Sequence, residues 1–94
     1  MKAARKPTAA EIRTMDQRRD AERLATRLYN QALAGANDRG LSAELKAGRW
    51  RLAAQAQRDL ATLYYKVGAN DNGAYHDRKA RAFDREEASY RKKS

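Results

Sequence analysis

Residues 35–40 read Gly-Ala-Asn-Asp-Arg-Gly, and residues 68–73, 33 positions further on, read Gly-Ala-Asn-Asp-Asn-Gly. The match continues past these segments, since Trp50 falls on Phe83 at the same offset. Repetition at a fixed period of this size is typical of stacked helical hairpins. Glycine readily takes the left-handed conformation that ends a helix, and Asn and Asp favour turns. The sequence therefore predicts a duplicated helix-turn-helix unit.

The two turns divide the chain into three predicted helices, over about residues 8–34, 42–67 and 74–91. Thr8 and Glu11 have the spacing of a capping box, and Ser42 is a favourable N-cap. Twenty alanines and a single proline also favour helix. We expect an all-α fold, a three-helix antiparallel bundle. The sequence does not decide whether Gly48 breaks the central helix.

The central helix carries two apolar arcs on nearly opposite sides at the helical step of about 100° per residue. Leu52 and Leu63 belong to the principal arc, and Trp50 and Ala54 to the other. A helix with two apolar sides is usually sandwiched, so we place it between the first and third helices. If Leu52 and Leu63 are buried, Leu→Ala at either costs about 2–5 kcal/mol. The third helix has a thin apolar stripe and should be the least firmly held.

Composition narrows the class of protein. The chain has 94 residues, which suits a single helical domain over residues 8–91 with basic tails at residues 1–7 and 92–94. The absence of cysteine excludes disulfides, thiolate nucleophiles and cysteine-bound metals, and favours a reducing compartment. No apolar stretch follows the basic start, and no run reaches the roughly 18 apolar residues of a membrane helix. We expect a cytoplasmic protein without a membrane partner.

The segment Tyr64-Tyr65-Lys66-Val67-Gly68, followed by Lys79-Ala80, resembles part of a tetratricopeptide hairpin, which places aromatics, a glycine and a Lys-Ala pair similarly. The resemblance covers less than a third of the chain. Gly73 stands where that family usually has alanine, and Asp77 where it has an aromatic residue. The resemblance implies a helical hairpin and a peptide-binding scaffold, and we do not assign the chain to the family.

Little in the sequence points to catalysis. The only histidine, His76, lies beside Asp77 and is interpreted as a surface or capping residue, because partners for acid-base chemistry are absent. Asn70-Asp71-Asn72 lacks the alternating ligands and closing glutamate of a calcium loop. We expect no enzyme activity, no metal site and no cofactor.

The formal net charge of +9 should attract anions such as nucleic acid, whether DNA or RNA, or an acidic protein surface. The sharpest basic stripe lies within an arc of roughly 60° on the third helix, with no acid inside it. It consists of Arg78, Arg81, Arg85 and Lys92. Its alternative interpretation is the exposed side of a weakly amphipathic helix. On the first helix, Arg13, Arg19, Arg23 and Arg27 share a side with Asp16 and Asp20, which we interpret as a salt-bridged face.

Arg51 and Arg58 of the second helix are further candidates for contact with an anion, and Trp50 and Tyr65 are candidate aromatic contacts. For Trp50 the core is the favoured interpretation, because equivalent repeat positions such as Trp50 and Phe83 tend to pack equivalently. The leading hypothesis is a non-enzymatic protein that binds nucleic acid or a nucleoprotein through phosphates. The alternative is a helical adaptor or inhibitor that docks on an acidic protein. The sequence does not decide whether the protein forms a homo-oligomer.

Overall fold

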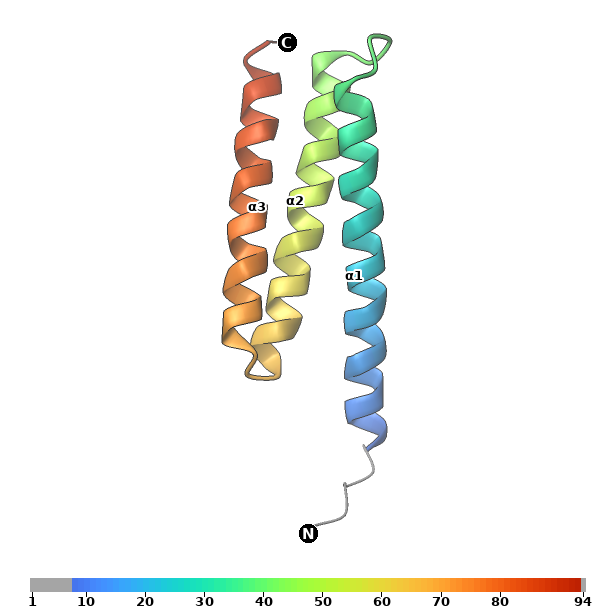
Figure 1. Ribbon diagram of the computed structural model, residues 1–94, viewed down its shortest axis with the longest axis vertical. Helices are drawn as coiled ribbons and strands as arrows, with labels where there is room; N and C mark the ends of the chain where they lie inside the picture. Colours follow the sequence, from blue (N-terminus) through green and yellow to red (C-terminus); the bar gives the residue numbers. More distant parts are fainter. Residues whose placement is uncertain (1–7, 94) are drawn as a thin grey trace.

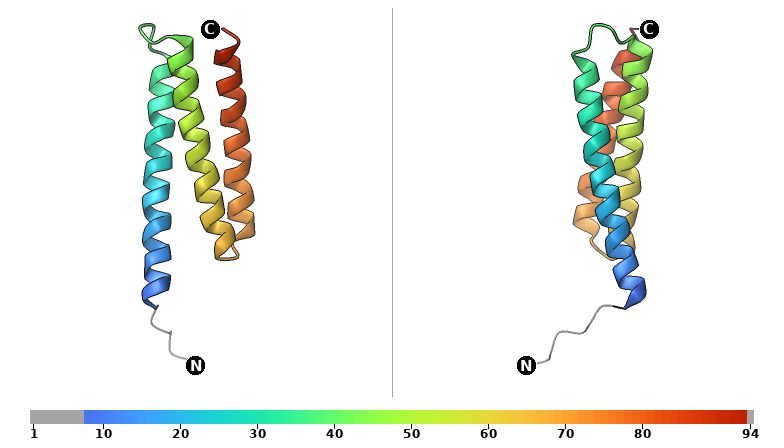
Figure 2. Two further views of the ribbon diagram at one scale, coloured as in Figure 1. Left: turned by 180° about the vertical axis from the view of Figure 1, so that it is seen from behind. Right: turned by 90° about the vertical axis from the view of Figure 1, so that its right-hand side faces the viewer.

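The computed structural model describes residues 8–93, which contain three α-helices and no strand (Figure 1). The helices are α1 (Ala9–Ala36), α2 (Ala43–Lys66) and α3 (Asn70–Arg91). They run antiparallel in sequence order, with α2 placed between the other two (Figures 1 and 2). The predicted all-α, antiparallel three-helix bundle is confirmed. The predicted tail at residues 1–7 and the last residue, Ser94, lie outside the described residues.

Both predicted N-caps are confirmed. The Thr8 hydroxyl accepts a hydrogen bond from the backbone N–H of Glu11 at 3.1 Å. The Ser42 hydroxyl accepts one from the backbone N–H of Leu45, also at 3.1 Å. Each bond satisfies one of the backbone donors that the first turn of a helix leaves unpaired. The starts of α1 and α2 are therefore determined locally.

The turn between α2 and α3 is shorter than predicted. Gly68 has φ +78°, and the N–H of Ala69 donates to the carbonyl of Tyr64 at 3.0 Å while that of Gly68 donates to Tyr65. This pair of bonds is a Schellman motif, which reverses the chain within a few residues. Consequently α3 begins at Asn70 instead of residue 74, and the segment 70–73 that was predicted as a turn is the first turn of the helix.

The turn between α1 and α2 has a different geometry, although its sequence is nearly the same. Gly35 lies inside α1, and Gly68 is the only residue with positive φ among those described. The chain turns over residues 37–42, where the Asp38 carboxylate accepts a hydrogen bond from the N–H of Gly40 at 2.8 Å. The prediction that both first glycines end their helices in the left-handed conformation is thus wrong for Gly35. The sequence repeat does not extend to the backbone of its two turns.

The core consists of alanines and a cluster of aromatic rings. Trp50 is 5% exposed, and its ring lies 5.3 Å from that of Phe83 and 6.0 Å from that of Tyr29. The rings of Tyr29 and Phe83 are stacked at 5.1 Å, which joins α1 to α3 through side chains. Small side chains allow helix backbones to approach closely. The buried alanines are Ala25, Ala32, Ala47, Ala53, Ala54, Ala56, Ala61 and Ala80.

The leucines of α2 are not distributed as predicted. Leu45 is 58% exposed and Leu52 is 57% exposed. Leu63 is half-buried, whereas Leu60, on the same arc, is buried. The prediction that Leu52 is a core residue is wrong, because α1 and α3 pack against the side of α2 that carries Trp50 and the buried alanines. Gly48 does not interrupt the helix.

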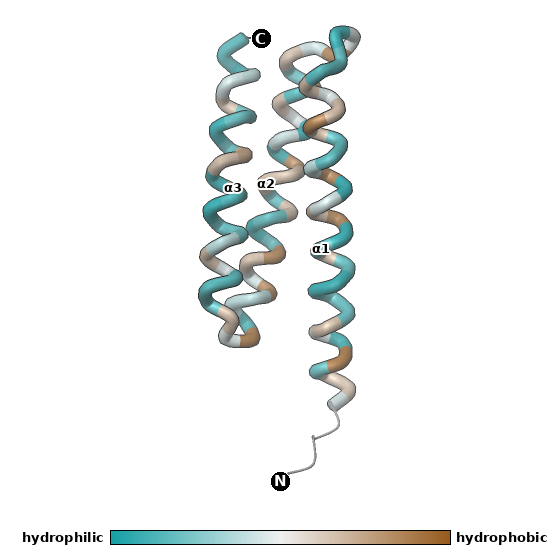
Figure 3. The backbone as a smooth tube through the Cα atoms, viewed as in Figure 1, coloured by the Kyte–Doolittle hydropathy of each residue, from teal (hydrophilic) through white to brown (hydrophobic). Residues whose placement is uncertain are grey.

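The three helices differ in how they are held. Helix α3 is mostly hydrophilic, and hydrophobic positions gather on α1 and α2 (Figure 3). Nevertheless α3 packs against α2 more extensively than α1 does, so the expectation that it is the least firmly held element is not met. The first turns of α1 extend past the α2–α3 turn (Figures 1 and 2). Within residues 8–93, no helix has the length and hydropathy required to cross a membrane.

Candidate functional site

The basic stripe predicted on the third helix is exposed along the outer side of α3. Arg78, Arg81, Arg85 and Lys92 are all exposed. Among residues 8–93, none of their side chains forms an ion pair or a hydrogen bond. The buried residues of this helix, Gly73, Ala80 and Phe83, lie on its other side. Arg78 and Lys92 are 14 positions apart in the chain, or roughly 21 Å at the helical rise.

Tyr65 of α2 lies beside the start of this stripe. Its side chain is 42% exposed, and its hydroxyl donates a hydrogen bond to Asp77 Oδ2 at 3.1 Å. Partial burial and the hydrogen bond to Asp77 raise the pKa of the Tyr65 phenol above 10.0. The charges of Arg81 and Arg78 lower this pKa, against those two effects. The hydrogen bond to Asp77, the residue before Arg78, brings the Tyr65 side chain next to the start of the stripe.

Gly73 makes room for the Tyr65 ring. A Cβ atom at residue 73 would lie 2.7 Å from the ring carbons, well inside van der Waals contact. The glycine that departs from the tetratricopeptide pattern thus has a specific role here, since the aromatic ring of α2 covers it. Asp77, the other departure, holds the hydroxyl of the same ring.

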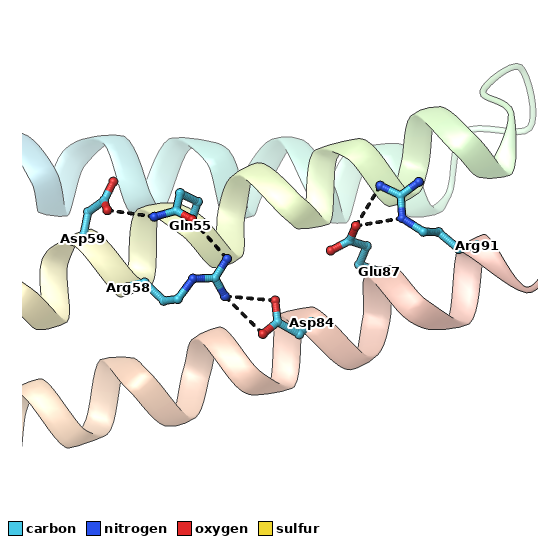
Figure 4. Close-up of polar contacts among 6 residues, drawn as sticks. All are labelled: Gln55, Arg58, Asp59, Asp84, Glu87 and Arg91. Atoms are coloured by element: carbon cyan, nitrogen blue, oxygen red, sulfur yellow. Dashed lines mark hydrogen bonds and ion pairs between the residues drawn. The ribbon is translucent and has the colours of Figure 1, made fainter.

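The two candidate arginines of α2 have different surroundings. Arg58 Nη1 lies 3.1 Å from both carboxylate oxygens of Asp84, and its Nη2 donates to Gln55 at 3.2 Å (Figure 4). Gln55 in turn donates to Asp59 at 2.9 Å. These contacts occupy Arg58 in joining α2 to α3, and we do not retain it as a binding residue. Arg51 is exposed and forms no ion pair within the described part of the chain.

Trp50 is a core residue, as its correspondence with Phe83 indicated. Its burial leaves no ring face for a base or a partner to stack on. The indole Nε1 is buried and has no hydrogen-bond acceptor among the described residues. We therefore do not retain Trp50 as a contact residue, and Tyr65 is the aromatic candidate that remains.

The arginines of α1 are not salt-bridged as interpreted from the sequence. Arg13, Arg19 and Arg23 are exposed, and none lies within 4.0 Å of a carboxylate of Asp16 or Asp20 in residues 8–93. The expected helix salt bridge is instead found on α3, where Arg91 pairs with Glu87 at 2.7 Å (Figure 4). The acids of α1 still lower the local positive potential, because Coulomb attraction extends beyond contact distance.

His76 is part of the α2–α3 interface and not a capping residue. Its ring stacks on Tyr64 with centroids 5.2 Å apart, and its Nδ1 lies 2.7 Å from Gln57 Oε1. Burial and the nearby charge of Lys79 lower the pKa of His76 below 6.5, against an opposing effect of Glu22. Tyr64 donates a hydrogen bond to Glu22 of α1, and this bond, with burial, raises the Tyr64 pKa above 10.0. These residues link the three helices.

One feature of α2, a hollow on its outward side, was not predicted from the sequence. Leu45, Gly48, Arg49 and Leu52 surround a hollow of about 560 Å³ that Leu41, Glu44, Arg51 and Arg91 also line. The signal was present in the spacing, because positions i, i+3, i+4 and i+7 share one side of a helix. The sequence instead indicated that the principal apolar arc, which contains Leu52, packs against a neighbouring helix.

Comparison of the chain with known proteins indicates no family and no function. No protein-family model matches it, nor does any curated protein sequence or solved structure. The helical hairpin that the tetratricopeptide resemblance implied is present in α2 and α3, whereas membership of that family is not supported.

Proposed function

We propose that the protein binds nucleic acid through phosphate contacts along the outer side of α3. The observation that carries the proposal is the exposed row of Arg78, Arg81 and Arg85, which continues to Lys92 and is not neutralised by an ion pair within residues 8–93. Guanidinium groups bind phosphate oxygens in a fork geometry. A row of roughly 21 Å can follow several successive phosphates of one strand.

Tyr65 supports this choice of ligand. An exposed aromatic ring next to a basic track is the combination that single-stranded nucleic acid favours, since a base stacks on the ring and the backbone follows the cations. The hydrogen bond to Asp77 and the contact with Gly73 hold the ring in place against α3, where Arg78 follows Asp77 in the chain. Such contacts carry no base-reading pattern, so we expect affinity without strong sequence preference.

Replacement of Arg78, Arg81 and Arg85 by Gln tests the proposal. Binding of a labelled DNA duplex and of a labelled single strand would be measured by fluorescence anisotropy over a series of salt concentrations. We expect weaker binding and a salt dependence that is flatter by up to about 0.9 per lost phosphate contact on the duplex. Folding should persist, because the three side chains face away from Phe83.

The matched control replaces Arg13, Arg19 and Arg23 by Gln, which removes the same formal charge from the side of α1 that also carries Asp16 and Asp20. A smaller loss in the control supports a site on α3. Equal losses would reduce the site to a general effect of net charge. No binding by the unchanged protein at low salt would contradict nucleic-acid binding altogether.

The second candidate function is a helical adaptor that docks on an acidic protein. The specific observation in its favour is the exposure of Leu45 and Leu52, because large apolar side chains grouped on a surface are typical of protein interfaces. Salt separates the two candidates. Phosphate binding weakens steeply as salt rises, whereas an apolar interface resists it.

A further inference from the structure

Gly48 lies in the middle of α2, where glycine destabilises a helix relative to alanine. Nothing lies within 4 Å of the position that a Cβ atom would take there. By contrast, Gly35 packs against Arg49 and Leu41, and Gly73 against Tyr65. The helix α2 therefore contains a glycine that no contact among the described residues requires. Glycine allows another group to approach the helix backbone closely, because it has no side chain.

The residues around Gly48 form the surface that another helix would need. Leu45, Gly48, Arg49 and Leu52 have the i, i+3, i+4, i+7 spacing of the four-residue hole that receives one side chain in knobs-into-holes packing. The glycine leaves this hole open, and the hollow has a volume of about 560 Å³. Leu45 and Leu52 are more than half exposed at its two ends.

We propose that this hollow is the docking site for an acidic amphipathic helix of another protein, with one large apolar side chain seated over Gly48 between Leu45 and Leu52. The docking site develops the second candidate function and does not depend on nucleic-acid binding. Exposed leucines on both sides of the glycine suit a helix that presents apolar residues every three to four positions.

Charge indicates which helix would bind. Three arginines, Arg49, Arg51 and Arg91, and one acid, Glu44, line the hollow. Arg91 pairs with Glu87, and Arg49 Nη1 donates a hydrogen bond to the Gln31 carbonyl at 3.1 Å. Arg51 is exposed and forms no ion pair within residues 8–93. Acidic residues beside the apolar stripe of the incoming helix would complement this rim.

The same charges disfavour a second copy of this chain as the occupant. Each copy carries a formal net charge of +9. If two copies of α2 crossed at Gly48, the Arg51 side chains would approach each other one helical turn from the crossing, and like charges in an interface are unfavourable. An acidic helix removes this repulsion and adds attraction.

The test uses two synthetic amphipathic peptides about three heptads long, with Leu at the a and d positions. One carries Glu at the e and g positions and the other carries Lys. Binding of each to the full chain would be measured by calorimetry. We expect the Glu peptide to bind and the Lys peptide to bind at least about tenfold more weakly.

The variant Gly48→Gln fills the hole with an uncharged side chain that a helix accommodates well. We expect it to weaken binding of the Glu peptide about tenfold or more while DNA binding is unchanged. The control Ala34→Gln adds a glutamine at an exposed position of α1 and should leave both unchanged. Circular dichroism of each variant checks that the helices persist.

Three outcomes would overturn the docking site. The first is no binding of the Glu peptide, and the second is equal binding of the two peptides. The third is a concentration-dependent dimer of the unchanged protein in sedimentation that Gly48→Gln abolishes, since the occupant would then be a second copy. None of these bears on the salt-dependent binding of DNA by Arg78, Arg81 and Arg85, so the two proposals fail independently.

Discussion

On one side of α2 small side chains are buried, and on the other side large apolar side chains are exposed. Its inward side is built mainly of alanines with Trp50 and Leu60, and these residues are enclosed by α1 and α3. Its outward side carries Leu45 and Leu52, which are exposed around Gly48. Alanines let two neighbouring helices approach α2, and the larger leucines are left outside the space that these neighbours cover. Apolar character alone therefore does not tell which side of a helix is buried.

Trp50→Ala is the substitution with the largest expected effect on the inward side. Trp50 contacts the rings of Tyr29 and Phe83, so its removal leaves a cavity where all three helices meet. We expect a loss of about 3–5 kcal/mol in the free energy of unfolding, measured by urea denaturation followed by circular dichroism. For a domain of this size, such a loss approaches the total stability.

Trp50→Phe serves as its control, because it keeps an aromatic ring and removes the buried indole N–H that has no acceptor among the described residues. Loss of an unsatisfied donor offsets part of the lost packing, and we expect a cost below about 1.5 kcal/mol. Equal costs for Ala and Phe would mean that the indole nitrogen makes an essential contact.

Leu60→Ala and Leu52→Ala compare the two sides directly. Leu60 is 1% exposed and packs with Ala25 and Ala56, so its truncation should cost about 2–5 kcal/mol. Leu52 lies on the exposed side, and its truncation should change the free energy of unfolding by no more than about 0.5 kcal/mol. Thermal melting of the two variants measures the difference. A large loss for Leu52→Ala would show that the outward leucines support the fold of the free chain.

Gly48→Ala should have the smallest effect and the opposite sign. The added methyl group meets no other atom within 4 Å, and alanine has the higher helix propensity. We expect the free energy of unfolding to rise by about 0.5–1 kcal/mol. Guanidinium denaturation of the variant beside the unchanged protein measures this gain. A destabilised variant would show that Gly48 serves the packing of the free chain.

The two turns show which local features of the fold can be predicted from the sequence and which cannot. Thr8 and Ser42 were identifiable as N-caps because a side-chain oxygen acts on a backbone N–H three residues away. Near-identical turn sequences nevertheless gave a loop at residues 37–42 and a Schellman motif at Gly68. The loop follows a helix whose Gly35 packs against Arg49, a residue of the next helix. A contact between two helices cannot be predicted from the sequence of the turn alone.

For the candidate site, the sequence identified the basic row of Arg78, Arg81 and Arg85, because a helical period alone places them on one side. It did not show that Asp84 occupies Arg58, since these residues belong to different helices and their pairing depends on the register between α2 and α3. Nor did it bring Tyr65 next to Gly73 and Asp77.

By itself the sequence determined the number of helices, their approximate limits and the +9 charge, because capping, propensity and composition act within a few residues along the chain. Only the tertiary structure decided which side of α2 is buried, since that choice depends on where α1 and α3 approach it. The alanine side permits the closer approach, so Trp50 became a core residue and Leu52 was left exposed.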